Sequence, residues 1–349
     1  MPEAVDDIMA RCPLKHDIRD SLWVPFARRV AGAGSLSKYL TLYSPPMMDI
    51  KHFHRNRLLD YDGETYRGVV AVTYDARHFA EAMKKSAGRP ALLLPGDIDQ
   101  LLTAEDTPDA ERLRSEFPFQ VINLDYTNWL FGQANTRPIS EHLEAIEEII
   151  RLQHSKHRDE FVLFVTTRAE RGRTASRNWF TRGFLQDLSD RINENLRGNP
   201  EFSRSFRRCF GNFGGTDLLA KDYKSFVPLG ISKLVAGILA RHSYEIEVAD
   251  GRVLVRDQRR PVRWLLHLAF HIRSAILPRA SRLRELGRPK DFYFERTLAR
   301  FVDLVGNGRL LSLSETADGR RLRTKHGAYV RELAAQTLDL AIPEPRPHD

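Results

Sequence analysis

The chain has 349 residues, of which 42% are hydrophobic, so it holds enough apolar material for one large core or two modest ones. This composition excludes a disordered chain. The longest apolar runs, at residues 161–165 and 264–270, are far shorter than the roughly 18 residues that a membrane span needs. The N-terminus is acidic and lacks the apolar core of a signal peptide. We therefore expect a cytoplasmic protein with no membrane partner.

Positive charge is concentrated in the second half of the chain. Residues 1–150 carry 17 Lys and Arg against 23 Asp and Glu, whereas residues 151–349 carry 37 against 23. This asymmetry favours a polyanionic partner, nucleic acid first, although a solvated arginine-rich helical face explains it equally well. The two cysteines, Cys12 and Cys209, have no His or Cys at zinc spacing, so the sequence predicts neither a disulfide framework nor a metal site.

The first 36 residues predict a helical extension. Apolar residues recur at near-helical spacing from Ile8 to Trp23, and the run Ala31-Gly-Ala-Gly34 then ends the pattern. Residues 38–43 predict a first strand, which Ser44 and two prolines end. The second proline, Pro46, is well placed to open a helix that continues to Phe53.

Strands and helices alternate over about 130 residues after that point. The predicted strands are 38–43, 68–74, 91–94, 119–125 and 160–167, and the predicted helices include 76–86, 110–116 and 139–153. Asp75, which follows the second strand, is a predicted N-cap. The alternation predicts a doubly wound α/β fold, with a mostly parallel sheet, right-handed crossovers and helices on both faces.

The pattern changes after residue 170. Glycine-rich runs between residues 198 and 217 predict a loop, within an insertion that extends to about residue 240 and contains a helix at 229–240. Residues 243–248 and 253–256 predict a hairpin joined by Asp250 and Gly251, and residues 263–272 predict another buried strand. We expect three regions: a helical extension (1–36), an α/β domain (37–275) and a basic helical tail (276–349).

Polar side chains gather where the predicted strands end. Asp125, Tyr126 and Asn128 follow the fourth strand, and Asp97 and Asp99 follow the third. The carboxyl ends of parallel strands meet at one edge of a sheet, where ligands bind, so we expect these groups to converge on one pocket. Two structural alternatives stay open: Asp97 and Asp99 are suited to cap the next helix, and Asp125 is suited to a hydrogen-bond network that ties its strand to the following loop.

Five parallel strands followed by an antiparallel pair resemble the fold of the class I S-adenosylmethionine-dependent methyltransferases, over roughly residues 37–275. In that family an acidic residue after the third strand commonly holds the adenine amino group, as Gly96-Asp97 would, and a polar motif after the fourth strand lines the methyl-transfer site, as Asn123-Leu-Asp125-Tyr126 would. The resemblance therefore implies S-adenosylmethionine as cofactor. It implies catalytic roles for Asp125, Tyr126 and Asn128, and cofactor contacts from Tyr43, Ser44, Thr73, Asp75, Gly96 and Asp97.

The chain departs from the family pattern at two strand ends. The turn after the first strand is Tyr43-Ser-Pro-Pro-Met-Met48, which has no glycine and lacks two backbone donors, and the second strand ends on Thr73 instead of an acidic residue. Two functions stay open. One is a methyltransferase that acts on nucleic acid. The other is a catalytically inactive methyltransferase-fold module that binds nucleic acid or a partner protein within a multi-component bacterial system.

Overall fold

A computed structural model of the chain describes residues 13–275 with interruptions, and a few residues beyond them. The interruptions are 45–46, 85–87, 104–106, 127–129, 131–140, 170–178, 218–222 and 257–262, and the described residues of the tail are 311–314, 318 and 321. No helix in this described part of the chain is both long enough and apolar enough to cross a membrane.

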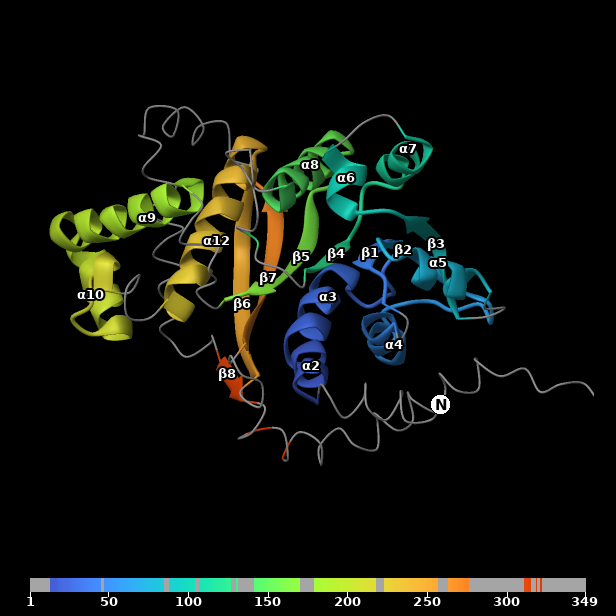
Figure 1. The fold of residues 1–349 in the computed structure, drawn as a ribbon, viewed down its shortest axis with the longest axis horizontal. Coiled ribbons are helices and arrows are strands. Elements are labelled where there is room, and N and C mark those ends of the chain that lie inside the picture. Colours follow the sequence, from blue (N-terminus) through green and yellow to red (C-terminus); the bar gives the residue numbers. More distant parts are fainter. Residues whose placement is uncertain are drawn as a thin grey trace, which may run out of the picture.

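An eight-stranded sheet forms the centre of the molecule, with the order β3-β2-β1-β4-β5-β7-β6-β8 (Figure 1). The first five strands run parallel, β7 is antiparallel to both β5 and β6, and β8 is parallel to β6. The strands are β1 (Tyr39–Leu42), β2 (Thr65–Thr73), β3 (Arg89–Pro95), β4 (Val121–Asp125), β5 (Glu160–Arg168), β6 (Tyr244–Arg256), β7 (Arg263–Ser274) and β8 (Leu311–Ser314). The predicted doubly wound α/β fold with an antiparallel C-terminal pair is confirmed.

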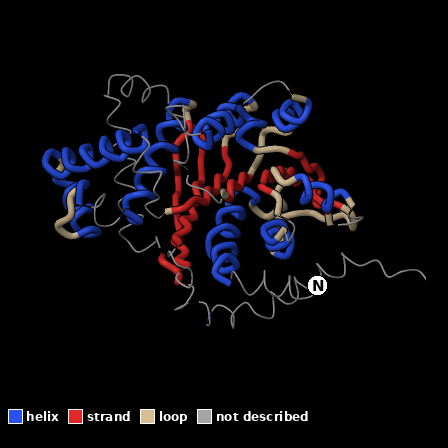
Figure 2. The backbone as a smooth tube through the Cα atoms, viewed as in Figure 1, coloured by secondary structure: helices blue, strands red, loops and turns tan. Residues whose placement is uncertain are grey.

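Helices cover both faces of the sheet, and Figures 1 and 2 show two helical layers with the strands between them. One face carries α6 (Ile98–Thr103), α7 (Pro108–Ser115), α8 (Glu141–Ser155) and α12 (Tyr223–Arg241). The other carries α2 (Pro13–Ile18), the π-helix η1 (Arg19–Trp23), α3 (Val24–Ala31) and α4 (Met48–Arg55). Helix α5 (Ala76–Met83) lies against β2 and β3, and α9 (Trp179–Gly198) packs on α10 (Pro200–Phe210).

Consecutive residues of a strand enter different cores. In β1, Leu40 packs among the α6 and α8 side chains while Tyr39 packs on the opposite face, and in β4 Ile122 and Val121 divide in the same way. Because both faces are covered, the strands are continuous apolar runs, and this is why they were visible in the sequence. Full burial of each such side chain stabilises the fold by about 1.5–3 kcal/mol.

Side-chain caps mark the start of the helices that follow β2 and β3. The carboxylate of Asp75 accepts from the backbone N–H groups of Arg77 and His78, so its predicted role as the N-cap of α5 is confirmed. At the start of α6, Asp97 Oδ1 accepts from the backbone N–H of Asp99 at 2.9 Å. Asp97 therefore acts as a cap whatever else it contacts.

The predicted hairpin at residues 243–256 is wrong. Residues Tyr244–Arg256 form the single 13-residue strand β6, within which Asp250 and Gly251 pair with Ala269 and Leu268 of β7. A long neighbouring strand holds the Asp-Gly pair extended, so tertiary pairing overrides the local turn signal. The irregularity in this strand falls instead between Ile246 and Val248, where the register shifts by one residue.

The predicted loop at residues 198–217 is largely helical. Asn199 caps α10 by accepting from the backbone N–H of Phe202, and the helix ends at Gly211, whose φ of +62° suits a glycine. In the tail, residues 311–314 form a strand at the sheet edge, where we expected helix. Most of the tail lies outside the described residues.

The N-terminal extension is helical from residue 13 to residue 31, as predicted, but it packs directly on the sheet. Helix α3 contacts β5 and β7, and α2 and η1 contact β6. Trp23 stacks on Phe164 of β5, with ring centroids 5.5 Å apart. These helices therefore share a core with the strands, and they form one wall of the site described below.

Candidate functional site

A cleft of about 330 Å³ opens at the carboxyl ends of β1, β2, β3 and β4. Strands β1 and β4 are neighbours from which the chain continues in opposite directions across the sheet, so the cleft lies at the topological switch point where open α/β sheets bind ligands. Its volume is within the range of roughly 300–1,000 Å³ that is usual for small-molecule sites. Its walls come from β1–β4, the N-terminal helices, and the first turns of α4, α6 and α8.

Most of the predicted site residues line this cleft, namely Tyr43, Ser44, Gly96, Asp97, Asp125 and Tyr126. Asp97 and Asp125 thus open onto one pocket, as expected. Thr73 and Asp75 are not among the lining residues: the Thr73 hydroxyl accepts from the backbone N–H of Asp75, and Asp75 caps α5. Asn128 lies outside the described residues. The cofactor and catalytic roles of this set stay predictions.

Asp125, at the end of β4, is paired with Lys15 of α2. The Lys15 Nζ donates to Asp125 Oδ2 at 3.0 Å, and the two side chains are 20% and 22% exposed. Burial raises the pKa of Asp125, but the nearby charges, Lys15 first, outweigh burial and lower it to about 2. The second oxygen, Oδ1, is buried and has no hydrogen-bond partner among the described residues.

The π-helix η1 turns Arg19 and Trp23 toward the cleft. The Arg19 guanidinium lies 5.7 Å from the centroid of the Trp23 ring. The Arg19 Nε and Trp23 Nε1 atoms are both buried, and neither has a hydrogen-bond partner within the described part of the chain. Short π-helices occur frequently at functional sites, and the two residues of this one that carry unpaired N–H groups both line the cleft.

A buried hydrogen-bond network forms the floor of the cleft. Asp49, in the first turn of α4, accepts from the Tyr39 hydroxyl at 2.7 Å and from the Thr41 hydroxyl at 2.6 Å. The Asn123 side-chain amide reaches all three groups at 3.3–3.4 Å. Burial and the Asp49 charge raise the pKa of Tyr39 well above its usual value. The other end of the amide, Asn123 Oδ1, is buried without a partner among the described residues.

A second network lies where β4 meets α6 and α8. Asp99, which is 2% exposed, accepts from the Tyr126 hydroxyl at 2.7 Å and from Nδ1 of His142. The Tyr126 and His142 rings are stacked, with centroids 4.1 Å apart. Burial and the charge of Asp99 raise the pKa of Tyr126 well above its usual value, so this hydroxyl stays protonated and donates. Both rings line the cleft.

The rim of the cleft at β2 and β3 is aromatic and apolar. Tyr74, directly after β2, is 83% exposed although it lines the cleft. Across from the end of β2, Gly96 has a φ of +129° and its backbone N–H donates to the Thr73 carbonyl. Only glycine adopts that conformation readily, so the turn that carries Asp97 depends on it.

The sequence analysis missed four of these residues, namely Lys15, Arg19, Trp23 and His142. Lys15 and Arg19 are four apart on a helix, a spacing that puts two cations on one face, and this signal was available. Nothing local pointed to His142, because its partner Asp99 is 43 residues earlier in the chain.

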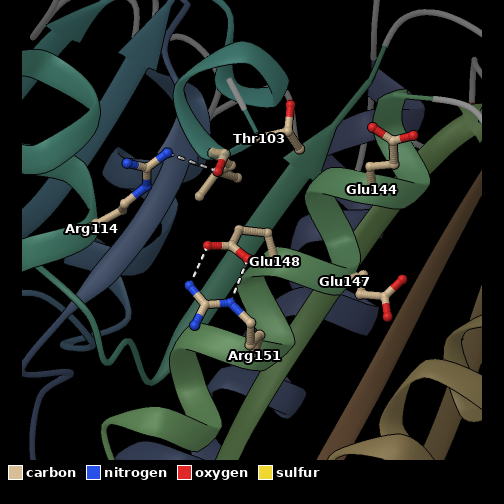
Figure 3. Close-up of a pocket in the computed structure, with 7 residues that line it drawn as sticks. Thr103, Arg114, Glu144, Glu147, Glu148 and Arg151 are labelled. Atoms are coloured by element: carbon tan, nitrogen blue, oxygen red, sulfur yellow. Dashed lines mark hydrogen bonds and ion pairs between the residues drawn. The ribbon is translucent and has the colours of Figure 1, made fainter. Parts of the chain in front are cut away.

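A second hollow, of about 430 Å³, lies on the outer surface of α6, α7 and α8 (Figure 3). Its polar groups are already paired: Arg151 binds Glu148 through two hydrogen bonds of 2.6 Å, and Arg114 donates to the Leu102 carbonyl. Figure 3 shows the Arg151 side chain turned along the surface of α8 toward Glu148. The hollow is a surface depression bordered by ion pairs.

One cluster on the sheet has the composition of a metal site. The ligand atoms of Glu160, Glu247 and His271 lie within 4.8 Å of one another. Arg273 also binds both carboxylates, at 3.1 and 2.9 Å. Because this arginine already balances their charge, the cluster is an ion-pair network that joins β5, β6 and β7.

The strand order and the position of the cleft define an α/β protein of the Rossmann-like, methyltransferase-like class. Within it, the chain belongs to the PP_RS20740-like family, whose model matches residues 12–249. No curated protein matches the sequence.

Two solved structures are similar over most of their length. One is the plantazolicin methyltransferase BamL, in complex with a triazolic desmethylPZN analogue and SAH; it is 7% identical, with a TM-score of 0.35 over 77% of this chain and 90% of that one. The other is a protein of the NADB-Rossmann superfamily from Streptococcus agalactiae, which is 10% identical, with a TM-score of 0.28 over 91% and 96%. Both TM-scores are below 0.5, so the assignment of the fold rests on the strand order of this chain.

Proposed function

We propose that the cleft binds S-adenosylmethionine and that the protein is a methyltransferase. One observation carries the proposal: four residues that line the cleft carry buried donors or acceptors that have no partner among the described residues. The donors are Arg19 Nε and Trp23 Nε1, and the acceptors are Asn123 Oδ1 and Asp125 Oδ1. A buried polar group without a partner costs about 1–3 kcal/mol, so such atoms indicate a ligand that completes them.

An α-amino acid group complements both kinds of atom. Its carboxylate would accept from Arg19 and Trp23, and its ammonium would donate to Asn123 and Asp125. Charged hydrogen bonds of this type contribute about 1.5–3 kcal/mol each. S-adenosylmethionine carries this group on its methionine end, so the donor set fits the cofactor that the fold class implies.

The nucleoside end would lie toward β2 and β3. Tyr74 offers an exposed ring for stacking on the adenine, and Ile98 offers an apolar contact from α6. Asp97, which is exposed at the same edge, would accept from the adenine amino group. A ligand with an amino acid at one end and a purine at the other spans the cleft from η1 to β3.

The missing glycine turn after β1 is compensated from another element. Family members present backbone N–H groups to the methionine moiety from that turn, whereas this chain has two prolines there. Lys15, Arg19 and Trp23 place side-chain N–H groups on the same cleft from the N-terminal helices. In this protein, side-chain N–H groups would therefore bind the methionine carboxylate, which backbone N–H groups bind in other family members.

When bound, the cofactor would supply a methyl group activated by a positively charged sulfur. The protein's own contribution would be positional. Arg19 and Asp125 would hold the amino acid end, Tyr74 and Asp97 the base, and Trp23, packed on Phe164, would exclude water from the wall between them. Such positioning supplies much of the rate acceleration in group transfer.

Calorimetry tests the proposal directly. We expect heat on titration of the intact protein with S-adenosylmethionine and with S-adenosylhomocysteine, and none with NAD. Arg19→Ala should weaken both interactions by about 10–100-fold, the value of one charged hydrogen bond, while Arg151→Ala in the surface hollow should bind like wild type. An absence of heat with both cofactor forms, at protein concentrations near 100 μM, would sink the proposal.

A second function is favoured by the surface of α10. Phe202 and Phe206 of this helix are buried, while Arg204, Arg207 and Arg208 are exposed. We propose that this basic face contacts nucleic acid, either as the methyl acceptor or as the ligand of a catalytically inactive module. A gel shift that weakens with salt, and that falls when the three arginines are replaced by glutamine, would support it. Equal shifts for the variant and the wild type would contradict it.

A further inference from the structure

The hydrogen bonds of Asp99 fix the protonation of the His142 ring. An ionised carboxylate accepts hydrogen bonds and donates none, so the Nδ1 atom that contacts Asp99 Oδ2 must carry a proton. The other oxygen of Asp99 is occupied by the Tyr126 hydroxyl. The neutral imidazole therefore has its lone pair on Nε2.

The protein makes no use of Nε2 in the part of the chain that the structure describes. The His142 side chain is 22% exposed and lines the cleft, and its Nε2 makes no hydrogen bond to the described residues. Stacking on Tyr126 and the bond to Asp99 restrain the ring from both sides. A restrained imidazole with a free lone pair facing a pocket has the geometry of a general base.

We infer that His142 is the base that removes a proton from the methyl acceptor, that Asp99 is its positioning residue, and that the acceptor is a hydroxyl compound. This inference rests on the proposed function. A neutral amine or thioether attacks a methyl group through its own lone pair and needs no base. A hydroxyl is a weak nucleophile until its proton is removed. The presence of an oriented base therefore favours an acceptor that must lose a proton before it attacks, and among these we infer a hydroxyl.

In the proposed reaction, His142 takes up the proton that leaves the acceptor. The acceptor O–H bond breaks, its proton forms an N–H bond with His142 Nε2, and the bonding pair stays on the acceptor oxygen. The resulting imidazolium is stabilised by the Asp99 carboxylate on Nδ1. The oxygen would then be able to attack the methyl group that a bound cofactor would supply, and the electron pair of the broken sulfur–methyl bond would stay on sulfur.

The cleft contains a matched control. His78 of α5 also lines it, but its Nδ1 lies 3.8 Å from Asp75, beyond hydrogen-bond distance. The Asp75 carboxylate is engaged instead by backbone N–H groups. His78→Gln therefore removes an imidazole from the same cleft without removing an oriented one.

The first measurement is nitrogen-15 NMR of histidine-labelled protein near pH 8, with no ligand present. We expect His142, identified by the signal lost in His142→Gln, to be the tautomer protonated on Nδ1, and Asp99→Asn to abolish that preference. Protonation of His142 on Nε2 in the wild type would overturn the inference. Because no cofactor is present, this result is independent of the proposed function.

The second measurement uses 4-nitrophenol, a hydroxyl compound that turns yellow when it ionises, and protein saturated with S-adenosylhomocysteine. We expect wild type and His78→Gln to increase the phenolate absorbance, and His142→Gln to leave it at the value of buffer. No increase with wild type, or an equal increase with His142→Gln, overturns the inference. Calorimetry on the same samples reports whether S-adenosylhomocysteine is bound, so loss of cofactor binding, which would defeat the proposed function, is recognised separately.

Discussion

The cleft at the switch point and the hollow on α6–α8 show what marks a binding site in this protein. The two are comparable in size, at about 430 Å³ for the hollow and about 330 Å³ for the cleft. Its Glu148 and Arg151 satisfy each other, whereas the cleft holds buried atoms of Arg19, Asn123 and Asp125 without partners among the described residues. Unused hydrogen-bonding capacity, and not volume, distinguishes the two.

The largest effect is expected under the cleft. Asp49→Ala would leave the hydroxyls of Tyr39 and Thr41 and the Asn123 amide without their shared acceptor. Since each buried donor left unpaired costs about 1–3 kcal/mol, we expect a loss of about 3 kcal/mol in the free energy of unfolding, measured with urea. Tyr74→Ala at the exposed rim, where the side chain is 83% exposed, is the control. Equal losses for the two variants would mean that the hydrogen bonds of Asp49 contribute no more to the free energy of unfolding than a side chain at the exposed rim does.

Acid should weaken the contact between the cleft wall and β4. The folded-state pKa of Asp125 is about 2, below the unfolded value of about 3.9. The stabilisation is therefore present above about pH 4, is lost as the pH falls toward 2, and amounts to about 2 kcal/mol. Unfolding of wild type and of Lys15→Met, compared between pH 7 and pH 2.5, should show a difference at pH 7 that shrinks in acid. A difference independent of pH would contradict this assignment.

Stacking at the rim should contribute less than the charged contacts. Tyr74 is 83% exposed, so Tyr74→Ala has little to disturb in the fold. Loss of one ring under the adenine should weaken binding of S-adenosylhomocysteine by about 1 kcal/mol, or roughly fivefold. Tyr74→Phe keeps the ring and should bind normally. If both variants bind like wild type, the nucleoside lies elsewhere.

The smallest effect is expected in the hollow. The ion pair of Arg151 with Glu148 joins a half-exposed arginine to a surface carboxylate, and such pairs contribute about 0–1 kcal/mol. Arg151→Ala should change the free energy of unfolding by no more than about 0.5 kcal/mol and leave cofactor affinity unchanged. A large loss of cofactor binding in Arg151→Ala would mean that the hollow, and not the cleft, is the binding site.

The fold was readable in the sequence because its strands are buried on both faces. Runs such as 161–165 need no long-range information to be recognised as strands. The Asp250-Gly251 pair shows the limit: it has the composition of a turn, but β7 lies alongside it and keeps it extended. The local composition favours a turn, but pairing with β7 determines the structure of these residues.

The candidate site was only half readable, for a related reason. Asp97 and Asp125 follow strands, so parallel topology alone brings them together. Lys15 meets Asp125 across 110 residues, and His142 meets Asp99 across 43. Neither contact follows from the spacing of residues, because it depends on how the N-terminal helices and α8 dock on the finished sheet.

The pairing of Lys15 with Asp125 also bears on the order of assembly. Helix α2 is synthesised before every strand of the sheet, yet the carboxylate that it meets comes 110 residues later, and η1 contacts a strand that comes later still. Contacts so distant along the chain form slowly, because their closure entropy must be overcome before they stabilise anything. We therefore expect the wall of the cleft to form late in folding, so that only completely folded molecules would bind the ligand.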